Sequence, residues 1–203
     1  MKSPERTKAR IIHSAALLFA RYGFSGTSMS RIARKAGVNK ASVYYHFRGK
    51  DTLYRIVLEA GLKNMIRRVH YRLVSARTGD RDERQLIETF FDYWRTNPEV
   101  LKLMVHEINN GAEYLKRILS SPARETMQRS LANIISILDK VLISRKGSES
   151  ERLQRFISLV GMLMIYFLLK PLFREIFQLS ENGEAAFLND RINSIIGLAH
   201  LLD

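Results

Sequence analysis

Cationic, hydroxyl and aromatic side chains follow one another between residues 40 and 50 of the chain. The set comprises Lys40, Ser42, Tyr44, Tyr45, His46, Arg48 and Lys50. Lysine and arginine neutralise phosphate groups, hydroxyl groups donate and accept hydrogen bonds, and tyrosine rings offer flat apolar faces to thymine methyl groups or sugars. Double-stranded DNA requires this mixture of contacts, so the segment is a candidate DNA-contacting surface.

Helix-capping residues indicate which elements position this set. Thr27 and Ser28 are N-cap types, and Gly37 supplies the positive φ that a tight helix end needs without a Cβ penalty. Asn39 is suited to cap a second short helix. The apolar side of that helix would consist of Val43 and Phe47. Two helices joined by a turn that contains glycine form a helix-turn-helix.

The distribution of charge supports the same interpretation. The chain of 203 residues has a formal net charge of +13. Residues 1–50 contain eleven lysines and arginines against Glu5 alone, whereas the other 153 residues carry 22 basic and 19 acidic side chains. A positive field concentrated on the first quarter favours a polyanionic partner there. The alternative is a basic surface that is merely solvated.

The segment resembles a known family. Residues 27–53 follow the pattern Thr-Ser-Met-x-x-Ile-Ala-x-x-Ala-Gly-Val-x-x-x-x-Val-Tyr-Tyr-His-Phe-x-x-Lys-Asp-x-Leu. This pattern is similar to the DNA-binding domain of TetR-family transcriptional repressors, and the resemblance covers about residues 8–54. A helix-turn-helix alone is only a moderate signal, but the Tyr-Tyr-His-Phe-x-x-Lys tail is much less common outside this family.

The resemblance implies roles for individual residues. The predicted DNA-binding set is Thr27, Ser28, Asn39, Lys40, Ala41, Ser42, Tyr44, Tyr45, His46 and Lys50. In relatives, the positions of residues 40–42 most often face base edges, those of 44–46 and 50 usually hold phosphates, and those of 27 and 28 contact the DNA backbone. Tyr44 matches a position that sometimes contacts a base. Ring packing on the protein's own core is the alternative for Tyr44 and His46, and a solvated charge is the alternative for Lys40.

The whole chain, apart from its turns, has helical periodicity. The predicted helices span residues 4–22, 27–36, 40–47, 50–77, 82–96, 98–108, 112–119, 121–145, 149–179 and 184–202. A kink or break is possible at Pro171. The sequence therefore predicts an all-α fold with a three-helix DNA-binding domain at residues 1–50. Residues 51–203 would form a larger helical domain for ligand binding and dimerisation, joined to the first by the helix that starts at Lys50.

A nearly unbroken apolar run extends from Phe156 to Leu169. It is shorter than the ~20 residues that cross a bilayer, and a helix that is apolar all round must be buried. We therefore expect one face to pack inside the subunit and the other against a second copy, with an ordinary single-chain core as the alternative. The resemblance implies a homodimer through residues 149–179 and 184–202. Its two recognition helices would lie about 34–36 Å apart, on an inverted-repeat operator.

The family resemblance also implies a ligand cavity among the middle helices, whose occupation moves the helix that starts at Lys50. Residue types suited to line it are Phe90, Tyr93, Trp94, Met104, His106, Asn109, Met127 and Tyr166. Each could instead belong to the core or the surface. Adjacent residues on a helix point about 100° apart, so His106 and Glu107 do not form a metal pair.

The sequence lacks the motifs of the common enzyme classes. It has no cysteine, no Gly-x-Ser-x-Gly elbow, no phosphate-binding glycine loop and no His-Glu-x-x-His. The N-terminus lacks the apolar segment of a signal peptide. We expect a cytoplasmic DNA-binding regulator without a cofactor or metal, which a small, mostly apolar effector releases from a palindromic operator. The alternative is a DNA-associated architectural or protein-interaction module without an effector.

Overall fold

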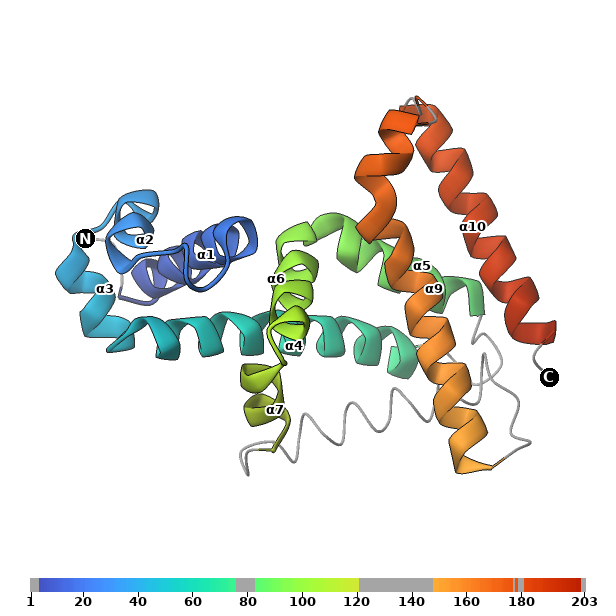
Figure 1. Cartoon of the computed structure of the whole chain (residues 1–203), viewed down its shortest axis with the longest axis horizontal. Coiled ribbons are helices and arrows are strands. Elements are labelled where there is room, and N and C mark those ends of the chain that lie inside the picture. Colours follow the sequence, from blue (N-terminus) through green and yellow to red (C-terminus); the bar gives the residue numbers. More distant parts are fainter. Residues whose placement is uncertain (1–3, 76–82, 121–147, 177, 179–180, 202–203) are drawn as a thin grey trace. The chain divides into compact units, whose positions relative to one another are not determined.

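The computed structural model describes residues 4–75, 83–120, 148–176, 178 and 181–201. Figure 1 shows that this part of the chain is built from helices. The helices are α1 (Pro4–Tyr22), α2 (Met29–Ala36), α3 (Lys40–Phe47), α4 (Lys50–Ser75), α5 (Glu83–Thr96), α6 (Pro98–Asn109), α7 (Glu113–Ser120), α9 (Glu149–Ile176) and α10 (Glu181–Leu201). The described residues contain no strand, and the predicted all-α fold is confirmed.

The start of the last helix differs from the prediction. The helix expected from residue 184 begins at Glu181. An acidic side chain is favourable at a helix N-terminus, and the cost of about 1 kcal/mol for Gly183 does not prevent the helix from starting before it. Pro171 lies inside α9 without ending it. Beyond the proline, the Phe173 ring contacts the Phe187 ring of α10 at a centroid distance of 6.1 Å, and this packing holds the last turns. The predicted helix at 121–145 lies outside the described residues.

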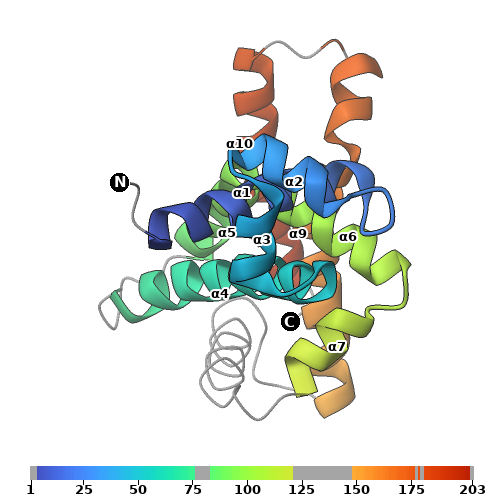
Figure 2. The same cartoon turned by 90° about the vertical axis from the view of Figure 1, so that its left-hand side faces the viewer.

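One compact unit comprises Met1–Met65 and Asn97–Thr126. Within it α1 packs against α2 and α6, and α2 packs against α3; Figure 2 shows α1, α2 and α3 grouped together. The centre of this packing consists of side chains that are at most 1% exposed, namely Ile11, Ala15, Phe19, Ile32, Val43, Phe47 and Leu53. This unit extends beyond residue 50 and includes α6, so its limits differ from the expected domain boundary at residue 50. That boundary remains a prediction about function.

The second compact unit comprises Ile66–Thr96 and Met127–Asp203. In this unit α5 packs against α9 and α10, which also contact each other. Phe91 of α5 contacts the rings of Tyr166 and Phe167 on α9 at centroid distances of 5.8 and 5.3 Å. Arg84 extends the contact by donating to the Asn193 side chain of α10, at 2.6 Å. Aromatic packing and side-chain hydrogen bonds thus join the three helices.

Helix α9 buries only part of its apolar surface. Leu163 and Tyr166 are 3% and 4% exposed. Other large apolar side chains of this helix are between 41% and 65% exposed: Leu153, Ile157, Ile165, Leu168, Leu172 and Ile176. The described residues therefore leave this face exposed, and the predicted dimer contact stays a prediction. No described helix combines the length and the apolar character that crossing a membrane requires.

Candidate DNA-binding surface and associated clusters

The turn between α2 and α3 is fixed by local chemistry. The Ser28 hydroxyl oxygen accepts from the Arg31 N–H at 3.2 Å and caps α2. Gly37 ends α2 in the left-handed region, with φ of 61°. A Cβ on this glycine would lie 2.7 Å from the Arg10 guanidinium, which itself donates to the Ala36 carbonyl. The backbone conformation therefore favours glycine at this turn, and a larger residue would also displace the Arg10 guanidinium.

Helix α3 has a buried side and an exposed side. It begins where the Asn39 carbonyl oxygen accepts from the Ser42 N–H, at 2.7 Å. Val43 and Phe47 are 0% and 1% exposed, which confirms their predicted packing. The opposite side presents Lys40, Ala41, Tyr44 and Tyr45. Tyr45 is 84% exposed and Tyr44 is 43% exposed, with the Lys40 ammonium 5.8 Å from the Tyr44 ring centroid. The predicted contact of these four residues with DNA stays a prediction, but each is accessible to a partner.

Besides the capping residues Ser28 and Asn39, other members of the predicted set have partners inside the protein. Thr27 is 1% exposed, and its hydroxyl lies 2.9 Å from the Gly23 carbonyl oxygen, to which it donates. Lys50 donates to the Thr27 carbonyl at 3.1 Å. His46 is half-buried, with its ring centroid 5.3 Å from that of Tyr45. The Thr27 side chain therefore stabilises the loop before α2, whereas the Lys50 ammonium has three protons to donate and retains capacity for a phosphate.

Lys50 also belongs to an aromatic cluster near the start of α4. Its ammonium lies 4.3 Å from the centroid of the Phe24 ring. Phe24 contacts Tyr54 at 5.1 Å, and Tyr54 contacts both Phe19 and Tyr114 at 4.9 Å. Phe24, in the loop after α1, thus takes part in the aromatic packing of its unit. The cluster joins α1, α4 and α7.

A buried carboxylate completes this arrangement, and the sequence analysis did not find its role. Glu107 of α6 is 4% exposed. One of its oxygens accepts from the Tyr54 hydroxyl at 3.1 Å, and the other accepts from the backbone N–H groups of Tyr114 at 2.6 Å and Leu115 at 3.3 Å. The sequence position of Glu107 could have indicated that it is buried. Glu107 follows Leu103 by four residues and so lies on the apolar face of a predicted helix.

The network of Glu107, Tyr54, Tyr114 and Asp51 keeps both phenols protonated. Burial raises the pKa of Tyr54, and the negative charge of Glu107 and its hydrogen bond raise the pKa further. Burial raises the pKa of Tyr114 to about 12, assisted by the hydrogen bond that its hydroxyl donates to Asp51 at 2.5 Å. A neutral tyrosine donates to a carboxylate, so the network is fully paired at neutral pH.

The described residues among the predicted ligand-lining set belong to two compact units, and their role stays a prediction. Met104 is buried, His106 half-buried and Asn109 exposed, and all three belong to the first unit. Phe90, Tyr93, Trp94 and Tyr166 belong to the second unit, and the last three are at most 4% exposed. Met127 lies outside the described residues. No group of three or more histidine, aspartate or glutamate side chains suited to a metal occurs in the described ranges.

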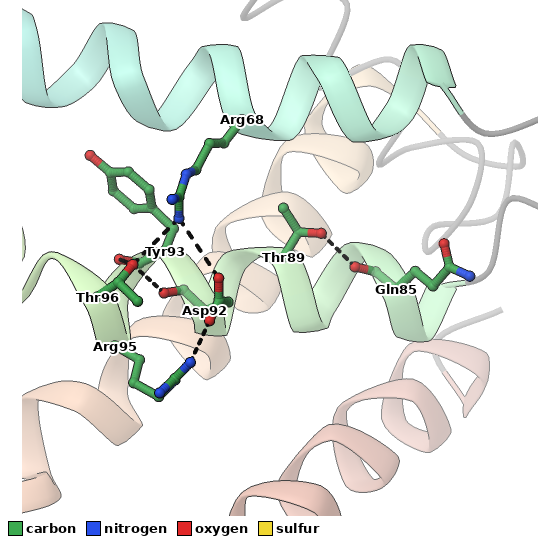
Figure 3. Close-up of polar contacts among 7 residues, drawn as sticks. All are labelled: Arg68, Gln85, Thr89, Asp92, Tyr93, Arg95 and Thr96. Atoms are coloured by element: carbon green, nitrogen blue, oxygen red, sulfur yellow. Dashed lines mark hydrogen bonds and ion pairs between the residues drawn. The ribbon is translucent and has the colours of Figure 1, made fainter.

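A cleft of about 610 Å³ lies in the second unit and has a different lining. Its walls are formed by Arg67, Arg68, Tyr71, Arg72, Gln85, Glu88, Thr89 and Asp92. Figure 3 shows Arg68 of α4 reaching toward α5, where it contacts Asp92 and Thr96. None of the predicted ligand residues in the described part of the chain lines this cleft.

Comparisons with known proteins match both the sequence and the fold. The family described as bacterial regulatory proteins, tetR family, matches residues 11–57. The HTH-type transcriptional repressor SCO4008 of Streptomyces coelicolor is 34% identical over 113 residues, which cover 56% of this chain and 54% of that protein. The HTH-type transcriptional regulator SrpR of Pseudomonas putida is 44% identical over 54 residues, or 27% and 25% of the two chains. This chain thus aligns with about half of the first relative and a quarter of the second.

Solved structures extend the likeness to nearly the whole chain. A TetR-like transcriptional regulator from Rhodococcus sp. RHA1 has a TM-score of 0.66 at 17% identity, covering 95% of this chain and 93% of that one. The fatty acid degradation regulator FadR from Bacillus halodurans also has a TM-score of 0.66, at 14% identity, covering 98% and 96%. At these identities the likeness shows a shared fold.

Proposed function

Because this chain belongs to the tetR family of bacterial regulatory proteins, we propose that it is a transcriptional regulator that inserts α3 into the major groove of DNA. The observation that carries the proposal is the two-sided character of α3. Val43 and Phe47 anchor one side, while Lys40, Tyr44 and Tyr45 are exposed on the other. A groove about 12 Å wide admits a helix presented in this way. A regulator of this kind would act in the cytoplasm, where its operator DNA would lie.

Dimerisation is the second part of the proposal. The uncovered apolar side chains of α9 extend from Leu153 to Ile176, and burying them against a second copy would remove them from water. With α10 beside α9, two copies would form an interface of four helices, as the family resemblance implies. A two-fold dimer requires an inverted-repeat operator. Occupation by a small-molecule effector would release the operator, as the family resemblance implies.

Selection of bound duplexes from a random pool tests the DNA-binding part directly. Fluorescence anisotropy on the selected duplex then compares the wild type with Tyr45→Ala and Lys40→Ala. Tyr45→Ala should weaken binding about tenfold, and Lys40→Ala should lower the slope of log affinity against log salt by about one. Lys116→Ala, which removes an exposed lysine of α7 paired with Glu113, is the matched control. Recovery of no duplex, or equal affinities in all four proteins, would contradict the proposal.

Sedimentation equilibrium tests the dimer. Leu168→Glu and Ile176→Glu each place a charge on the uncovered face of α9, where the wild-type side chains are 41% and 65% exposed. Because both positions are exposed in the single chain, the variants should fold and sediment as monomers. Lys116→Glu introduces the same side chain on α7 and should leave the dimer intact. A wild type that is monomeric at micromolar concentration would overturn this part.

A further inference from the structure

Two polar stripes in the second unit face each other across the 610 Å³ cleft. Helix α5 contributes Gln85, Glu88, Thr89 and Asp92, which repeat every three to four residues and so share one face. The last turns of α4 contribute Arg67, Arg68, Tyr71 and Arg72. The volume lies within the roughly 300–1,000 Å³ of small-molecule sites. A space of this size with polar walls is suited to a ligand that carries charge.

The carboxylates of the cleft already have cationic partners. Asp92 pairs with Arg95 at 2.7 Å and with Arg68 at 3.7 Å. Glu88 pairs with Arg84 at 2.9 Å. Among the described residues that line the cleft or pair with its lining, five arginines therefore oppose two carboxylates. The excess of charge is positive.

The hydroxyl groups near the arginines are also engaged, as Figure 3 shows. Thr89 donates to the Gln85 carbonyl at 2.7 Å, and Thr96 donates to the Asp92 carbonyl at 2.7 Å while it accepts from Arg68 at 3.4 Å. Arg68 is thereby held against α5, and Arg72 lies one turn further along α4. Arginines four residues apart on a helix repel each other. An anion between them would relieve this repulsion.

We propose that this cleft binds a small organic anion whose carboxylate or phosphate group is held by the arginines of α4. The planar guanidinium donates two parallel hydrogen bonds to either group. Tyr71 is 71% exposed on the same helix and offers a flat face to the remainder of the ligand. The binding site does not depend on the proposed function, whereas the further step, that this anion is the effector, does rest on it. The effector would then be anionic, whereas the sequence analysis predicts a mostly apolar effector.

Isothermal titration calorimetry on the full chain tests the site with four probes that share one ring. Phenyl phosphate and benzoate should bind saturably with one site per chain, whereas neutral benzyl alcohol and cationic benzylamine should bind at least about tenfold more weakly. Arg72→Gln should weaken phenyl phosphate at least about tenfold, because a hydrogen bond to a charged group is lost. Arg55→Gln removes an arginine from the same helix, paired with Glu59 and outside the cleft lining, and should leave the affinity unchanged.

Three results would overturn the anion site. They are no saturable binding of either anion, equal losses in Arg72→Gln and Arg55→Gln, or neutral and cationic probes that bind as tightly as phenyl phosphate. A nucleic-acid role for the cleft would appear as displacement of phenyl phosphate by a random duplex in a Lys40→Ala, Tyr45→Ala double variant, in which α3 no longer competes. That displacement would also overturn the proposal.

Operator binding in the presence of phenyl phosphate separates the site from the effector role. If the proposal holds in full, the anion lowers operator affinity in the wild type and in Arg55→Gln but not in Arg72→Gln. Anion binding with unchanged operator affinity would keep the site and overturn its role as the effector site. Anion binding by a protein that binds no duplex would overturn the proposed function and leave the site in place.

Discussion

The Glu107 network and the α4–α5 cleft combine the same kinds of side chain with opposite results. Around Glu107, both carboxylate oxygens accept hydrogen bonds, and the two tyrosines of the network are neutral donors. Around the cleft, arginines outnumber carboxylates and Tyr71 is exposed. The comparison indicates that pairing, and not residue type, separates a structural cluster from the proposed binding site. A cluster whose groups are all paired stabilises the fold, whereas a cluster with excess charge is available to a ligand.

The largest expected effect comes from removing the centre of the paired cluster. Glu107→Ala leaves the Tyr54 hydroxyl and the Tyr114 N–H without their acceptor in a buried place, and it also opens a void. We expect the free energy of unfolding to fall by about 3 kcal/mol, because each unsatisfied buried group costs about 1–3 kcal/mol. Urea denaturation measures this loss. Glu113→Ala, at an exposed position paired with Lys116, should change it by less than about 1 kcal/mol. Equal effects would remove the contrast between the two clusters.

Tyr54→Phe should lower the free energy of unfolding by a smaller amount. The ring and its contacts with Phe19 and Phe24 remain, and only the hydrogen bond to Glu107 is lost. We expect a loss of about 1.5 kcal/mol, the low end of the range for a bond to a charged group. Urea denaturation of the single and double variants with Glu107→Ala gives the coupling energy. Strict additivity of the two changes would contradict the network, since contacting groups couple.

In the α4–α5 cleft, removing a carboxylate should change the affinity for the anion and leave the stability of the fold nearly unchanged. Asp92→Asn removes one of the two carboxylates that oppose the cleft arginines and frees Arg68 from its ion pair. We expect phenyl phosphate to bind severalfold more tightly, while the free energy of unfolding changes by less than about 1 kcal/mol, because exposed ion pairs contribute little. Calorimetry and urea denaturation measure the two quantities. A weaker affinity for the anion would indicate that Asp92 positions Arg68 and does not compete with the ligand.

The smallest expected effect is a change in stability at high pH. The fold raises the pKa of Tyr114 from its ordinary value of 10 to about 12, so it favours the neutral phenol. This contribution to stability is fully present below pH 10 and is lost as the pH rises through about 12. The stability difference between the wild type and Tyr114→Phe should therefore narrow over this window in urea denaturation. Two parallel stability curves would contradict the raised pKa.

Local features of the structure were predictable because each depends on a few neighbouring residues. Ser28 and Asn39 cap their helices as their residue types predict, and Gly37 adopts the positive φ that its position requires. The start of α10 was misplaced by three residues, because the cost of Gly183 in a helix is too small to prevent the helix from starting before it. The helical periodicity of residues 40–47 predicts that Val43 is buried and Tyr45 is exposed, as the structure has them.

The features that depend on how helices pair were not predictable in this way. Glu107 was considered only as a failed metal ligand, since no sequence pattern shows that Tyr54, 53 residues away, will meet it. The predicted ligand residues were chosen by type, and the structure divides them between two units. Arg72 and Glu88 carried no signal of their own, because a cleft exists only where two helices leave a space.

By itself, the amino-acid sequence determined the helical fold, the helix-turn-helix and the surplus of positive charge on its first quarter. These properties arise from capping, periodicity and composition, which act over a few residues or add over many. Only the tertiary structure decided which charged groups meet one another. The physical reason is that pairing depends on distances of about 3–4 Å between atoms far apart in the chain, and those distances exist only after the helices have packed.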